Sequence, residues 1–255
     1  MKRRNSIFLL LFLGITAGCG AQNFVKPNAH YDYHLVKIDS TLDSKVDPKL
    51  DKYLNHKKLQ LAKEMNVVIG HCDQTMTSFA PQSPLSNFLT DLLLNNAAAY
   101  AEPGKIVQPD VAILNFGGIR APLAAGDVTV GDVFAISPFD NHLVFIELTG
   151  FELKRVFERF YPNANVACFS GLQVSMADDK ATVTMPDGSP ILDDHLYTLV
   201  TLDFIAEGGD KILTYIRFEH TYLTNVVFRD FIIQEIRKLE AQGKKVTAKL
   251  DERIR

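Results

Sequence analysis

Apolar side chains recur every three or four positions in several segments of the chain, a spacing that predicts amphipathic helices. The strongest such segment, residues 84–101, carries an apolar stripe made of Leu85, Phe88, Leu89, Leu92 and Leu93. Residues 150–161 repeat the spacing, with an inward face expected at Leu153, Val156, Phe157 and Phe160. Both segments are therefore predicted to be helices that cover a hydrophobic core.

Capping residues predict two further helices. Asp47 followed by Pro48 is a favourable start, because Asp accepts hydrogen bonds from free N–H groups and Pro suits the first helical position. We expect this helix to run to about Glu64. Thr224 is expected to cap a last long helix that reaches about Ala241.

Short apolar runs between turn residues predict buried strands. These runs occupy residues 65–70, 111–114, 142–149, 166–176, 181–185 and 196–203. Pro186-Asp187-Gly188 is a turn signal after one of them. The mixture of strands and helices predicts one compact domain of the α/β or α+β layered class.

The first residues have the layout of a secretory signal peptide. Three basic residues precede Ile7–Ile15, an apolar run that is too short to span a bilayer as a helix. The small residues that follow end in Cys19, as in a bacterial lipoprotein signal, although Thr16 stands where Leu is usual. We expect residues 1–18 to be removed and Cys19 to be lipidated. A plain signal peptide with an incidental Cys19 and an uncleaved anchor are the alternatives.

Composition narrows the function classes. The 255 residues include 30 acidic and 27 basic side chains, and removal of residues 1–18 takes the formal net charge from −3 to −6. A chain of that charge is not expected to bind nucleic-acid polymers. Three cysteines are too few for a disulfide scaffold. Besides Cys19 they are Cys72 and Cys168, which either pair or remain buried free thiols.

The expected organisation has four parts: the signal peptide, a leader or linker over residues 19–46, a linking helix over 47–64 and one domain over 65–255. The leader has room for one strand.

A Gly-Gly turn follows the predicted strand at 111–114. In the run NFGGIR, Gly117 and Gly118 allow a tight turn and a close approach of ligand to backbone. Arg120 ends the run, and its guanidinium is a planar donor for phosphate or carboxylate. Taken alone, the segment also fits a structural turn with a solvated Arg.

Three other segments carry residues suited to a nucleoside. SPFDN contains Phe139 and Asn141, and LDFIAEGGD contains Phe204 and Asp210. Asn87 lies in the first turn of the predicted helix at 84–101. Two loop aromatics can hold a base between their faces, a carboxylate accepts the paired hydroxyls of a ribose, and an amide both donates and accepts.

Six segments occur in the order SPLSNFLTD, VAILNFGGIR, AAGDVTVGDVF, SPFDNHLVFIELTG, FSGLQV and FIAEGGD. This series resembles the C-terminal, substrate-binding domain of the 5′-nucleotidase family, which includes UDP-sugar hydrolases, and it covers roughly residues 65–240. The resemblance implies a mixed β-sheet with flanking helices. It implies that Arg120 contacts phosphate, that Phe139 and Phe204 clamp the base and that Asp210 holds the ribose. It also implies base or ribose contacts from Asn87 and Asn141, and a backbone contact from Gly171.

The sequence departs from this family pattern at three positions. Ser86 stands where Gly is usual, Phe116 where a small residue is usual, and Lys211 where Gly is common. These changes are expected to narrow or retune the pocket. Further arginines that some members use for phosphate have no counterpart here.

Family members carry hydrolysis on a separate N-terminal metallophosphatase domain with a two-metal site. Its motifs, including a GNH-type segment, do not occur in these residues. His30, Asp32 and His34 would share one face of an extended strand and could bind a metal, but a polar edge or leader is the favoured interpretation. His71-Cys72 is likewise interpreted as a strand end rather than a nucleophilic pair.

The leading hypothesis is the nucleotide-recognition part of a 5′-nucleotidase-type phosphohydrolase, anchored by lipid at the cell envelope. A separate metallophosphatase chain would be its partner and would hold the divalent metals; no cofactor is expected on this chain. The alternative is a non-catalytic nucleotide- or nucleoside-binding envelope lipoprotein. A self-sufficient hydrolase that uses His71 or the His30 cluster is a third hypothesis.

Overall fold

The computed structural model describes residues 33–105, 108–160, 166–177 and 180–255. The expected signal peptide and Cys19 lie outside the described residues, as do His30 and Asp32. The chain divides into two units, Met1–Pro48 and Lys49–Arg255. In the described part of the first unit, the regular structure is η1, a 3-10 helix at Ser40–Lys45 that Asp39 caps.

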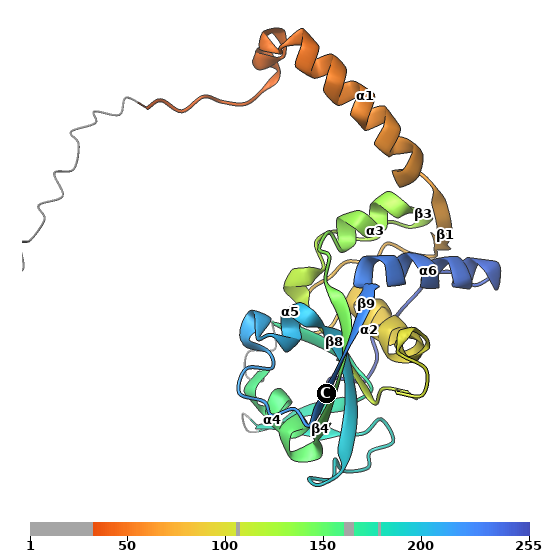
Figure 1. The fold of residues 1–255 in the computed structure, drawn as a ribbon. Helices are drawn as coiled ribbons and strands as arrows, with labels where there is room; N and C mark the ends of the chain where they lie inside the picture. Colours follow the sequence, from red (N-terminus) through yellow and green to blue (C-terminus); the bar gives the residue numbers. More distant parts are fainter. Residues whose placement is uncertain (1–32, 106–107, 161–165, 178–179) are drawn as a thin grey trace, which may run out of the picture. The chain divides into compact units, whose positions relative to one another are not determined.

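From Pro48 onward, helices and strands alternate irregularly (Figure 1). The α-helices are α1 (Pro48–Met65), α2 (Pro84–Asn96), α3 (Val130–Ile136), α4 (Gly150–Phe160), α5 (Asp203–Ala206) and α6 (Phe228–Ala241). Three 3-10 segments are η2 (Ala97–Tyr100), η3 (Phe116–Gly118) and η4 (Gly209–Lys211). The strands are β1 (Val68–Cys72), β2 (Val111–Asn115), β3 (Gly126–Thr129), β4 (His142–Thr149), β5 (Ala167–Ser170), β6 (Gln173–Ala177), β7 (Lys180–Thr184), β8 (Leu196–Leu202) and β9 (His220–Val227).

The main sheet is mixed and has the strand order β5-β2-β8-β4-β9. β2 runs parallel to β8, whereas the β5, β4 and β9 pairings are antiparallel. Helix α2 packs against β2 and β5, and α4 packs against β4, β7 and β8. Every residue of β2 is buried, as expected for a central strand covered on both faces. The predicted layered class, with a mixed sheet and flanking helices, is confirmed.

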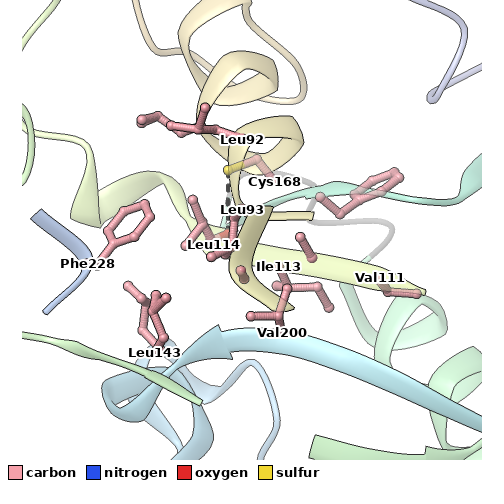
Figure 2. Packing of buried hydrophobic residues seen from close by; sticks show 14 of the residues in the cluster. Leu92, Leu93, Val111, Ile113, Leu114, Leu143, Cys168, Val200 and Phe228 are labelled. Atoms are coloured by element: carbon pink, nitrogen blue, oxygen red, sulfur yellow. Dashed lines mark hydrogen bonds between the residues drawn. The ribbon is translucent and has the colours of Figure 1, made fainter. Parts of the chain in front are cut away.

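The core surrounds the main sheet and includes buried residues of α2, α4 and α6. Figure 2 shows Leu92 and Leu93 of α2 beside Leu114 and Phe228, with Cys168 of β5 next to them. The Cys168 thiol donates to the carbonyl oxygen of Leu114 at 3.5 Å, and burial raises its pKa to about 12. Cys168 and Cys72 are both buried free thiols, so the sequence alternative of a disulfide is not realised.

Helix α2 begins at Pro84, as predicted, because its first turn is closed by two serines. Ser83 Oγ accepts from the Ser86 N–H at 3.2 Å, and Ser86 Oγ accepts from the Ser83 N–H at 3.0 Å. This capping box satisfies donors that would otherwise be free at the helix start. Ser86, a departure from the family pattern, therefore stabilises the helix from a buried position.

Two sequence predictions of elements were wrong. Thr224 does not cap a helix; it lies within β9, and its hydroxyl donates to the Leu143 carbonyl oxygen at 2.8 Å, so α6 begins later at Phe228. The run at 166–176 is two strands, because Gly171 adopts a φ of 92° and ends β5. Short elements β3 and α3 were not predicted at all. In the described residues, none of the helices is both long and apolar enough to cross a bilayer.

The last residues of the chain are held against the domain by Arg253. This side chain is almost fully buried and its Nη2 lies 3.0 Å from Asp91 and 2.7 Å from Asp251. Its Nη1 donates to the Phe169 carbonyl oxygen at 2.9 Å. Burial alone would raise the pKa of Asp251, but hydrogen bonds from Arg253 outweigh it and lower that pKa.

We predict that Arg253→Met lowers the free energy of unfolding by about 3 kcal/mol, because it leaves carboxylates and a buried carbonyl without their donor. Urea denaturation at neutral pH measures the loss. Arg255→Met, at an exposed neighbouring pair with Glu252, is the matched control and should change little. Because the Asp251 pKa is lowered, its contribution is present at neutral pH and lost as the pH falls below about 4. The difference in stability between wild type and Arg253→Met should therefore narrow in acid, and a difference that does not change with pH would contradict this account.

Candidate functional site

Strand directions bring three loops to one edge of the main sheet. β2 and β8 are parallel, so the residues that follow Asn115 and Leu202 leave the sheet at the same edge. β4 is antiparallel to β8, with Leu143 opposite Leu202, so the residues that precede His142 arrive at that edge too. Three of the sequence-predicted segments, NFGGIR, SPFDN and LDFIAEGGD, therefore meet there.

Asn115 and Asp210 join the first and third loops. Asn115 Nδ2 donates to Asp210 Oδ2 at 2.6 Å, a charge-assisted hydrogen bond at the end of a fully buried strand. Asp210 reaches this position with a left-handed backbone, φ 50° and ψ 14°. A Cβ at Gly118 would come within 2.6 Å of Asn115 Oδ1, so the turn requires glycine there. The interaction fixes the direction of the Asp210 carboxylate.

Arg120 lies on the outside of the same turn. Its backbone N–H donates to the Ile136 carbonyl oxygen at 2.8 Å, which positions the residue beside the end of α3. Its guanidinium is exposed, and Nη1 donates to the Gly117 carbonyl oxygen at 3.2 Å. Phe116, the second departure from the family pattern, packs against the core instead of occupying the turn surface.

Phe139 and Phe204 are the two predicted aromatic residues of the site, and both are exposed, by 45% and 42%. Neither ring is turned into the interior, the location that is usual for Phe. Phe204 lies against Gly209, where a Cβ would come within 2.4 Å of the ring. Gly209 therefore lets the aromatic ring and the Asp210 turn approach each other closely.

Arg229 of α6 supports the loop that carries Phe139. Its Nη2 lies 2.6 Å from Asp140 Oδ1, and its Nη1 donates to the Pro138 and Phe139 carbonyl oxygens at 3.4 and 3.5 Å. The guanidinium also stacks on the Phe134 ring, 4.2 Å from its centroid. Because its side chain is largely buried, Arg229 stabilises the conformation of the loop and is not a solvated surface charge.

A His–carboxylate pair joins the second loop to the third. His142 Nδ1 lies 3.2 Å from Asp203 Oδ2, while Asp203 Oδ1 accepts from the Phe204 N–H at 2.7 Å. Asn141, next to His142, is half-buried. Its backbone carbonyl oxygen accepts a hydrogen bond from the Phe228 N–H at 2.8 Å. The three loops are thus linked to one another by side chains.

Two predicted site residues do not join this cluster. Asn87 is 2% exposed, and its Nδ2 donates to the Lys249 carbonyl oxygen at 2.8 Å, so its amide supports the C-terminal segment. Gly171 follows Ser170, which pairs with Ala112 near the start of β2, whereas the cluster surrounds Asn115 at the end of that strand. A Cβ at Gly171 would lie 2.1 Å from the Asp110 carbonyl oxygen, so this glycine serves backbone packing. Both residues lie apart from the three loops, and their contacts with a base or ribose stay predictions.

Asn115 was missed as a site residue, although it stands in the NFGGIR segment. The signal that could have found it is an amide at the last position of an otherwise apolar buried strand, directly before two glycines. Asp203 and His142 gave a weaker signal, because only strand pairing brings them together.

His71 and Cys72 show no nucleophilic arrangement. The His71 ring lies between Asp127 and Glu240, at 3.0 and 3.1 Å, and the hydrogen bond with Glu240 raises its pKa. Burial raises the pKa of the Cys72 thiol, which donates to the Gln74 carbonyl oxygen. His34 is exposed. Within the described ranges, no three His, Cys, Asp or Glu side chains gather in a way that could hold a metal ion.

Comparison with known proteins gives one family. The family model for "5′-nucleotidase, C-terminal domain" matches residues 68–217. The trifunctional nucleotide phosphoesterase protein YfkN of Bacillus subtilis is 26% identical over 229 residues, and a cell wall protein of Listeria monocytogenes is 30% identical over 191. The aligned regions cover 82% and 68% of this chain, but the chain spans only 15% and 23% of those relatives.

Solved structures agree with the sequence comparison. The 5′-nucleotidase precursor of Thermus thermophilus matches with a TM-score of 0.65 and 25% identity. The match covers 80% of this chain and 42% of the Thermus chain. The resemblance inferred from the sequence is thereby confirmed.

We predict that Arg229→Ala loosens the loop around Phe139, because the loop loses an ion pair, two carbonyl contacts and a stacking partner. Hydrogen exchange measured by mass spectrometry should show faster exchange in peptides that contain residues 138–141. Arg217→Ala, at an exposed pair with Glu219, is the matched control and should leave those peptides unchanged. Equal exchange in wild type and Arg229→Ala would contradict a role of Arg229 in stabilising this loop.

Proposed function

This chain belongs to the 5′-nucleotidase C-terminal domain family, and we propose that it is the nucleotide-recognition part of a 5′-nucleotidase-type phosphohydrolase. The observation that carries the proposal is the convergence of Asn115, Arg120, Phe139, Phe204 and Asp210 at one edge of the main sheet. These side chains supply aromatic, carboxylate and guanidinium groups together, and a nucleoside phosphate presents the matching base, ribose and phosphate.

Each group has an assigned task. Phe139 and Phe204 stack on the two faces of the base, where each stacking contact is worth about 1–3 kcal/mol. Asp210, held by Asn115, accepts hydrogen bonds from the ribose hydroxyls through its other oxygen. The exposed Arg120 guanidinium binds the phosphate. The Asn141 amide stays a proposed contact to the base or ribose.

Hydrolysis is assigned to a metallophosphatase carried by a separate polypeptide. A two-metal site clamps the attacking and leaving oxygens of phosphate-ester hydrolysis. The binding energy of the base and ribose on this chain would then orient the phosphate toward those metals. The divalent metals belong to the partner in this proposal.

We place the protein at the cell envelope, exported and lipidated at Cys19. The basic residues, the short apolar run and the small residues before Cys19 support this proposal. Acyl chains buried in a bilayer would anchor the chain without a spanning segment. The similarity to a cell wall protein of Listeria monocytogenes is consistent with export.

We predict that Arg120→Ala weakens AMP binding by about tenfold or more and adenosine binding by less than twofold, since only AMP carries the phosphate that the guanidinium binds. Isothermal titration calorimetry with both ligands measures the difference. Phe204→Ala is the companion variant and should weaken both ligands alike. Equal losses of AMP and adenosine on removal of Arg120 would refute the phosphate assignment.

We predict that the tagged full chain, isolated from membranes of its native host, carries phosphatase activity on AMP. Phosphate release should need a divalent metal, should stop with a chelator and should fall with Arg120→Ala. The chain produced alone in a heterologous host is the control and should bind AMP without hydrolysing it. Binding without any associated hydrolysis would instead support the non-catalytic lipoprotein.

A further inference from the structure

His142 and Asp203 pair at the point where the two loops that carry Phe139 and Phe204 join the main sheet. His142 begins β4, three residues after Phe139, and Asp203 directly precedes Phe204. The pair therefore links the sheet-proximal ends of the two aromatic loops. The His142 imidazole is half-exposed at this edge of the sheet, so a base bound by the two loops can meet it.

The hydrogen bonds of Asp203 determine which imidazole nitrogen carries the proton. Oδ1 accepts from the Phe204 N–H and Oδ2 faces His142 Nδ1. A carboxylate only accepts hydrogen bonds, so Nδ1 carries the proton, and Nε2 of the neutral ring is left as an acceptor. The side chain thus presents an acceptor of fixed orientation.

Resting on the proposed function, we propose that His142, oriented by Asp203, reads the base and selects one that carries an exocyclic amino group. Adenine N6 and cytosine N4 donate to such an acceptor, whereas the carbonyl oxygens at the corresponding positions of hypoxanthine and uracil are themselves acceptors and meet it without a hydrogen bond. His142 is a specificity-determining residue in this assignment, and Asp203 is the positioning residue that sets its tautomer.

Asp203→Asn gives a direct test, because it exchanges the donor and acceptor nitrogens of the His142 imidazole. The Asn carbonyl oxygen keeps the bond from the Phe204 N–H, which turns its NH₂ toward His142 Nδ1. Nδ1 must then accept, the proton moves to Nε2, and the ring presents a donor instead of an acceptor. The variant keeps the shape and hydrogen bonds of the pair while changing what the ligand meets.

The experiment is calorimetric titration of the full chain with adenosine and inosine, and with cytidine and uridine. All titrations are run at the same pH of 8.5. Wild type should bind the amino-bearing nucleoside of at least one pair about five- to tenfold more tightly, as expected for one hydrogen bond. His142→Ala should bring the ratio near one, and Asp203→Asn should invert it.

Glu147→Gln is the matched control. Glu147 lies on strand β4, as His142 does, but near the other end of the strand. Its Oε2 makes a similar contact with His220 Nδ1, at 2.9 Å. This variant should keep the wild-type ratio, and thermal denaturation verifies that all variants are folded.

The outcomes separate the two ideas. Tight binding by wild type, weakened by Phe204→Ala, with a ratio that His142→Ala and Asp203→Asn leave unchanged, overturns the base-reading assignment and leaves the proposed function standing. A wild-type ratio near one in both pairs overturns it as well. Absence of nucleoside binding by wild type overturns the proposed function and this assignment together.

Discussion

The parallel pairing of β2 with β8 is the constraint on which the rest of the site depends. Because parallel neighbours end at the same edge, it brings the Gly-Gly turn and the Phe204 loop together, although about 85 residues separate them in the chain. The Asn115–Asp210 hydrogen bond then connects the two turns. The left-handed backbone of Asp210 costs about 1–2 kcal/mol, and a charge-assisted bond of about 1.5–3 kcal/mol offsets it.

The sequence revealed the elements with strong apolar periodicity and missed those without it. Helix α2 begins where the pattern predicts because its apolar spacing and its cap agree, and strand β4 begins where its apolar run begins. The edge strand β9 alternates between exposed and half-buried residues, so its Thr224 was mistaken for a helix cap. Residues 166–176 were predicted as one strand because apolar residues lie on both sides of Gly171. The break at Gly171 could not be predicted, because this glycine packs closely against the backbone of Asp110, which is distant in the sequence.

The candidate site was predictable in its residue types but not in its contacts. Phe139, Phe204, Arg120 and Asp210 stand in loops at strand ends, a feature visible in the sequence. Asn87 resembled them, yet its amide is used by Lys249, 162 residues away, and no local pattern encodes that partner. Arg229 is a further case, because its partner Asp140 lies 89 residues away in the chain.

Contacts from neighbouring elements hold the backbone around the two exposed aromatic residues, Phe139 and Phe204. An exposed Phe ring contributes no burial free energy to folding. If the ring is mobile, it also loses rotamer freedom when it binds a ligand, which weakens binding. Here Phe204 is seated against Gly209 and its N–H is held by Asp203, while Arg229 holds the carbonyl groups around Phe139. The backbone on both sides is thus ordered before a ligand arrives. On the proposed function, such preorganisation would lower the entropy cost of ordering the two loops when a base binds.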